Sequence, residues 1–74
     1  MKEELKDALT LKYQGDIASA KANINVYLNN PVGIGEHPDV VHAMDEEISK
    51  LAEAQDKLST VKELLHPTKK TLVE

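Results

Sequence analysis

Residues 41–65 read VHAMDEEISKLAEAQDKLSTVKELL and carry the most regular hydrophobic pattern of the chain. Eight positions follow one another at alternating spacings of three and four residues: Val41, Met44, Ile48, Leu51, Gln55, Leu58, Lys62 and Leu65. Six of the eight are apolar, which is typical of a helix that packs along a coiled-coil seam. The polar members, Gln55 and Lys62, interrupt the seam. The pattern predicts a long amphipathic helix that needs a partner helix.

Prolines set the limits of this helix. Pro38 suits the first helical position, because the N–H that proline lacks has no partner there. Asp39 then falls in the first turn, where a carboxylate interacts favourably with the positive end of the helix dipole. Pro67 prevents the helix from continuing. We expect a helix over about residues 38–66, followed by a flexible tail at 67–74 that is alternatively available to dock on a partner.

A first helix is expected over about residues 2–30, which lack proline and are rich in Ala, Leu, Lys and Glu. Asn30 precedes Pro31, and proline disfavours helical geometry in the residue before it. This segment carries a matching seam at alternating spacings of four and three residues: Tyr13, Ile17, Ala20, Ile24 and Tyr27. The two segments therefore present complementary apolar stripes.

The two seams fit each other in antiparallel order when the numbers of facing residues add up to 68. The Tyr13 hydroxyl then comes within reach of the Gln55 amide. The full pairing is Tyr27 with Val41, Ile24 with Met44, Ala20 with Ile48, Ile17 with Leu51, and Tyr13 with Gln55. We expect an all-α, coiled-coil-like antiparallel two-helix hairpin, a single domain over residues 1–74 with a Pro/Gly loop at about residues 31–37.

The first helix has a second apolar series on roughly its opposite side. Its members are mostly small and recur at heptad spacing, with Val26 one turn further: Ala8, Leu11, Gly15, Ala18, Ala22 and Val26. One interpretation is that alanines are simply good helix formers on a solvated face. However, a two-helix hairpin shields one stripe per helix, and burial at about 25 cal/mol per Å² hardly offsets the ordering entropy. We therefore predict self-association through this face into a four-helix bundle, or binding of another protein there.

Composition excludes several classes of function. The net charge is −4, the nine basic residues are all lysines, and the only aromatic residues are two tyrosines, which argues against nucleic-acid binding. The chain has no cysteine, no secretory signal and no run of about 18–20 apolar residues, so we expect a cytoplasmic protein without a membrane span. A hairpin also lacks a concave pocket for most substrates. We expect no enzyme activity, no catalytic residue and no cofactor.

The loop and the start of the second helix hold the candidate metal ligands: His37, Asp39, His42 and Glu46. His42 and Glu46 are four residues apart on a helix and are near enough to share a metal ion. The alternative is a structural role for these residues: the Asp39 carboxylate interacts with the positive end of the helix dipole, and His42 pairs with Glu46 on the surface. From residue 22 to residue 49 there are five acidic residues and no lysine, so the bend of the hairpin should be acidic.

Residues 27–39 read YLNNPVGIGEHPD and precede an acidic, then Ala/Leu/Lys-rich helix. Together they resemble small uncharacterised helical proteins of T4-like tailed bacteriophages. The resemblance implies an accessory protein that works inside an infected bacterium, and it implies no catalytic or binding residues. The first functional hypothesis is a non-enzymatic oligomerising interaction protein, a small regulator, adaptor or assembly component. The alternative is a binding module whose acidic loop end holds a divalent metal or a basic protein surface.

Overall fold

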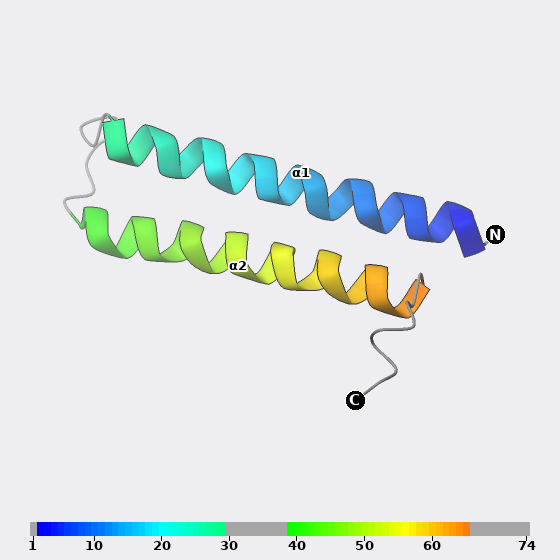
Figure 1. Cartoon of the computed structure of the whole chain (residues 1–74). Coiled ribbons are helices and arrows are strands. Elements are labelled where there is room, and N and C mark those ends of the chain that lie inside the picture. Colours follow the sequence, from blue (N-terminus) through cyan, green and yellow to red (C-terminus); the bar gives the residue numbers. More distant parts are fainter. Residues whose placement is uncertain (1, 30–38, 66–74) are drawn as a thin grey trace.

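The computed structural model describes residues 2–29 and 39–65. These residues form two α-helices, α1 (Lys2–Asn29) and α2 (Val40–Leu65), and no strand. Figure 1 shows the two helices side by side and antiparallel, so that the start of α1 and the end of α2 lie at the same end of the rod. The prediction of an all-α antiparallel hairpin is confirmed for these residues. The expected loop, the tail and the helix ends at residues 30, 38 and 66 lie outside the described residues.

The start of α2 differs from the expectation in one detail. The Asp39 carboxylate accepts a hydrogen bond from the His42 backbone N–H at 2.9 Å, and the Asp39 carbonyl accepts one from the Ala43 N–H at 3.2 Å. Asp39 is therefore the N-cap residue of α2 and not a first-turn residue, and Val40 is the first helical residue. Pro38 lies outside the described residues. An aspartate is favourable here because it satisfies an N–H that no helical carbonyl can reach.

The end of α1 is held by asparagine side chains. The Asn29 amide donates to the Asn25 backbone carbonyl and to the Asn25 side-chain oxygen, each at 2.8 Å. The Asn29 side chain thus adds a contact to the preceding turn of α1. Asn29 is the last residue that the structure describes in this part of the chain.

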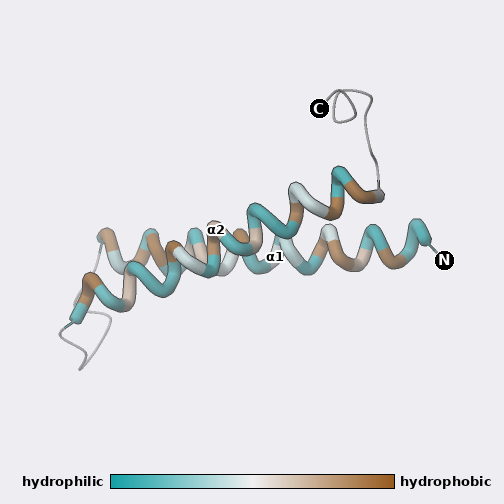
Figure 2. Tube along the Cα trace, turned by 90° about the horizontal axis from the view of Figure 1, so that it is seen from below, coloured by the Kyte–Doolittle hydropathy of each residue, from teal (hydrophilic) through white to brown (hydrophobic). Residues whose placement is uncertain are grey.

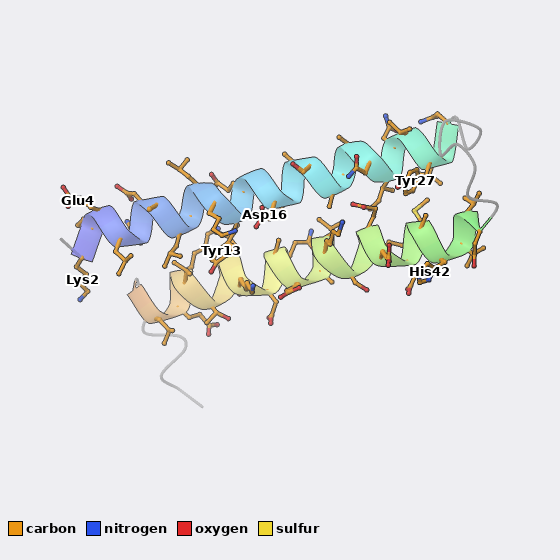
Figure 3. The ribbon with its side chains drawn as sticks, turned by 180° about the vertical axis from the view of Figure 1, so that it is seen from behind. Lys2, Glu4, Tyr13, Asp16, Tyr27 and His42 are labelled. Atoms are coloured by element: carbon orange, nitrogen blue, oxygen red, sulfur yellow. The ribbon has the colours of Figure 1, made fainter. Side chains whose placement is uncertain are left out.

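The face of α1 that lies against α2 is the predicted one. Ala20 is 2% exposed, and the other four seam residues are half-buried, whereas the residues on the opposite side of α1 are exposed. In Figure 3 the Tyr13 and Tyr27 side chains point from α1 toward α2. The prediction for the α1 seam, Tyr13, Ile17, Ala20, Ile24 and Tyr27, is confirmed.

The seam of α2 is only partly as predicted. Met44, Leu51 and Leu58 are shielded as expected, but Val41, Ile48, Gln55 and Lys62 are exposed, and the prediction for these four is wrong. The Leu65 side chain lies outside the described part of the structure. Their places are taken by the residues one position earlier in the chain. The shielded series of α2 is Val40, Met44, Glu47, Leu51, Ala54, Leu58 and Val61.

Burial of polar groups explains the choice. The predicted phase would place Gln55 and Lys62 between the helices, whereas the observed phase places Ala54 and Val61 there. Removing a lysine charge from water without a partner costs several kcal/mol, so the half of α2 farther from the loop strongly favours the observed phase. In the half nearer the loop, the same phase buries Glu47 and leaves Ile48 exposed. A straight helix cannot bury the apolar residues of both halves at once. The free-energy cost of burying Lys62 is larger than the apolar burial lost at Ile48.

Two side-chain contacts join the flanks of the helices. Asn23 donates to Glu47 across the helix pair at 3.2 Å, and the Lys57 ammonium lies 5.8 Å from the centre of the Tyr13 ring. The predicted register, in which the numbers of facing seam residues add up to 68, stays a prediction. The predicted Tyr13–Gln55 hydrogen bond is wrong, because Gln55 is exposed and the Tyr13 ring lies beside Lys57.

Polar residues are spread along both helices. Figure 2 shows hydrophobic segments of α1 and α2 separated by hydrophilic ones over the whole length of each helix. Neither of the helices formed by residues 2–29 and 40–65 has an apolar stretch long enough to cross a membrane.

Candidate interaction surfaces

The first candidate surface is the outer face of α1, which we define as Ala8, Leu11, Gly15, Ala18, Ala22 and Val26. All six residues are exposed, and Leu11 and Val26 retain 68% and 48% of their accessible surface. A Cβ atom added to Gly15 would meet nothing within 4 Å. The hairpin therefore leaves the whole predicted partner-binding face uncovered. Another helix could approach the α1 backbone most closely at Gly15.

A second apolar surface lies on α2 next to the loop, and sequence reasoning missed it. We call it the α2 strip: Val41, Met44 and Ile48, of which Val41 is 80% and Ile48 49% exposed. They form a shallow groove together with Val40 and Asp45. The pattern prediction had assigned all three strip residues to the seam with α1. Only Met44 contributes there, so the structure leaves Val41 and Ile48 unused.

The predicted metal ligands have other roles in the part of the chain that the structure describes. Asp39 caps α2, and His42 Nε2 lies 3.3 Å from Glu46 Oε2 in an exposed pair. His37 lies outside the described residues. Within residues 2–29 and 39–65, no three histidine, aspartate or glutamate side chains are grouped so that they could hold a metal ion. The described geometry is the structural alternative, a surface His42–Glu46 pair beside a helix cap.

A polar cluster occupies one flank of the helix pair, around Glu47. The Glu47 side chain is shielded, and its two oxygens accept hydrogen bonds from Asn23 and Lys50, each at 3.2 Å. The Asn23 amide lowers the pKa of Glu47, and the bond and charge of Lys50 lower it further, while burial acts in the opposite direction. The carboxylate therefore stays ionised between the helices. Sequence patterns missed Glu47 because an acidic residue rarely marks a core position.

The groove around this cluster is open and small. Its volume is about 240 Å³, below the roughly 300–1,000 Å³ of most ligand pockets. Its walls are a mixture of both charges: Asp16, Ser19, Ala20, Asn23, Glu47, Lys50, Glu53, Ala54 and Lys57. Most of these charged side chains form ion pairs within the chain. The groove is therefore a solvated flank of the helix pair and has few polar groups available to bind a ligand.

Lysines frame the aromatic ring at the far end of that groove. The Lys12 and Lys57 ammonium groups lie 5.9 Å and 5.8 Å from the centre of the Tyr13 ring, within the range of a cation–π contact. Lys57 also pairs with Glu53 at 3.1 Å, and the hydrogen bond to Glu53 raises the pKa of Lys57. The contact with Lys57 joins Tyr13 to α2, and each lysine also pairs with a carboxylate of its own helix.

Charge is distributed unevenly along the hairpin. In the described residues nearest the loop, 22–29 and 39–49, there are four acidic residues and no lysine. Asp39 caps its helix, Glu46 pairs with His42, and Glu47 binds Asn23 and Lys50. Asp45 forms no hydrogen bond or ion pair with the described residues, and it lines the groove of the α2 strip. The strip thus combines exposed apolar side chains with one unpaired carboxylate.

Comparison of the chain with protein-family models, with curated proteins and with solved structures gave no match. The resemblance to phage proteins therefore stays a prediction, and most of the loop that carries it lies outside the described residues. The exposed surfaces of the hairpin itself are the basis for a functional proposal.

Proposed function

We propose that this chain is a non-enzymatic interaction protein that self-associates through the outer face of α1 and serves as a small regulator, adaptor or assembly component. The observation that supports this most is how little the hairpin buries. Among the described residues, the buried apolar side chains are Ala20, Ala54 and Val61. Seven larger apolar residues stay exposed: Leu5, Leu11, Val26, Leu28, Val41, Ile48 and Leu64.

Energetics favour a partner for such a thin core. Ordering one residue costs about 1–2 kcal/mol of backbone entropy, whereas burying one CH₂ group contributes about 0.8 kcal/mol. Among the described apolar residues, only two alanines and one valine are buried, and the larger seam residues are half-buried, in two helices of 28 and 26 residues. Packing a second hairpin on the first would add burial without lengthening the chain, which is how small helical proteins commonly gain stability.

The outer face of α1 suits close packing of helices. Its alanines and Gly15 have small side chains or none, so another helix can approach the α1 backbone closely. Leu11 and Val26, before and after these small residues along α1, supply larger apolar side chains. None of the six contributes to the contact with α2. A partner can therefore bind this face without disturbing the hairpin.

The test compares Ala18→Glu with Ala52→Glu, which makes the same change at an exposed position on α2. Burying an unpaired charge between helices is costly, so Ala18→Glu should lower the assembly state and, through mass action, the apparent stability. Ala52→Glu should leave both unchanged. Sedimentation of the wild type and both variants over a concentration series gives the result. A wild type that is monomeric at high micromolar concentration, with Ala18→Glu melting like it, would refute the proposal.

A further inference from the structure

The apolar residues of α2 change phase along the helix. One series of eight is entirely apolar, Val41, Met44, Ile48, Leu51, Ala54, Leu58, Val61 and Leu65, but its alternation of spacings breaks between Leu51 and Ala54. The contact with α1 follows the phase of the second half throughout. Val41 and Ile48 are therefore left out of the hairpin, and their apolar character has no use within it. A glutamate, Glu47, is buried instead.

Exposed apolar residues on α1 adjoin the strip at the same end of the rod. Leu28 is 67% exposed in the last turn of α1, which lies beside the first turns of α2 (Figure 1). Helical spacing places Leu28 on the flank of α1 opposite Asn23 and Asp16, and places Val41 and Ile48 on the flank of α2 opposite Lys50 and Lys57. The polar cluster thus occupies one flank of the hairpin, and the apolar strip occupies the other.

Charge indicates what covers this strip. Asp45 lines its groove with a carboxylate that has no partner among the described residues, and the described residues around it, 22–29 and 39–49, contain no lysine. A second copy placed strip against strip would bring the two acidic ends together, and like charges in contact are unfavourable. A surface with basic residues beside apolar ones would instead complement both features of the strip.

We infer that the α2 strip is a docking site for an amphipathic helix of another protein, whose apolar face is bordered by lysine or arginine. Helix-in-groove recognition reads apolar residues at spacings of three and four, which is the spacing of Val41, Met44 and Ile48. The strip extends over eight residues, about 10 Å, so a helix of two to three turns covers it. The inference rests on the proposed interaction function, but it uses α2 and is separate from the outer face of α1.

The probe is a synthetic helical peptide with leucines at spacings of three and four and lysines along both borders, labelled for fluorescence anisotropy and titrated with the full chain. Ile48→Gln should weaken its binding about tenfold, since one large apolar contact is lost. Val41→Gln should act in the same direction. Leu64→Gln, a matched change at a residue that is 72% exposed on the far end of α2, should change binding less than twofold. Circular dichroism checks that each variant keeps its helices.

Charge reversal tests the border of the groove. Asp45→Lys should weaken binding of the lysine-bordered peptide and strengthen binding of the same peptide with glutamates in place of the lysines. If Leu64→Gln weakens binding as much as Ile48→Gln, the peptide binds apolar surface without specificity, and the inference is wrong. It is equally wrong if Ile48→Gln lowers the assembly state of the protein alone, because a second copy then covers the strip.

The two proposals fail separately. Ala18→Glu should lower self-association and leave peptide binding unchanged. Ile48→Gln should weaken peptide binding and leave self-association unchanged. Loss of peptide binding in Ala18→Glu would show that the peptide binds the outer face of α1 or needs the assembled form, and it would overturn the assignment to the α2 strip.

Discussion

Replacing Asn23 with alanine removes the one hydrogen bond between side chains of α1 and α2 that the described residues form. A hydrogen bond to a charged group contributes about 1.5–3 kcal/mol. Glu47 keeps its contact with Lys50 at 3.2 Å and lies at the rim of an open groove, so the lower end of that range applies here. Alanine is a better helix former than asparagine by about 0.5 kcal/mol. We expect a net loss of about 1 kcal/mol in the free energy of unfolding at pH 7.

Ser19→Ala is the matched control for this change. Ser19 is exposed, lines the same groove and gains a similar helix propensity on replacement by alanine. Urea unfolding followed by circular dichroism, at one fixed protein concentration because self-association would shift the midpoint, measures both variants. Asn23→Ala should be less stable than Ser19→Ala by about 1.5 kcal/mol, the value of the lost hydrogen bond.

The pH dependence gives the sharper test. The pKa of Glu47 is lowered in the folded chain, so its stabilising effect is present above the ordinary value of 4.5 and is lost as the pH falls through the folded pKa. The difference between Asn23→Ala and Ser19→Ala should therefore be full at pH 7 and should shrink once Glu47 is protonated. Equal stabilities at pH 7, or a difference that persists unchanged in acid, would refute the role given to the Asn23–Glu47 bond.

Two further predictions follow from the helix contacts. Gln55 faces solvent, so Gln55→Leu should change the free energy of unfolding by less than about 0.5 kcal/mol. Thermal melts measure this change. A rise of several degrees in melting temperature would instead support a seam that contains Gln55. Asp39→Ala removes the N-cap of α2, so it should lower the free energy of unfolding by about 1 kcal/mol and reduce the helix signal in circular dichroism. Asp39→Ser should retain most of the stability, because serine also caps helices. Equal losses in both variants would contradict the capping role.

Local signals in the chain were enough to predict the hairpin. Helix propensity, the prolines at positions 31, 38 and 67, and apolar spacing of three and four each depend on residues close in sequence. They gave two long helices, their antiparallel order and the face of α1 that meets α2. The same spacing predicted the outer face of α1, whose residues are exposed as a partner surface requires. What binds that face stays a prediction.

The phase of α2 depended on contacts between the helices. Met44, Leu51 and Leu58 belong to both possible seams, and the prediction followed the seam with Val41 and Ile48, although over residues 40–62 that seam has fewer apolar members than the observed one and would bury Lys62. The acceptable burial of Glu47 depends on Asn23, which is 24 residues away in sequence and reaches it across the helix pair. The α2 strip exists for the same reason: a rigid helix presents one phase to its neighbour, and residues of the other phase remain in solvent.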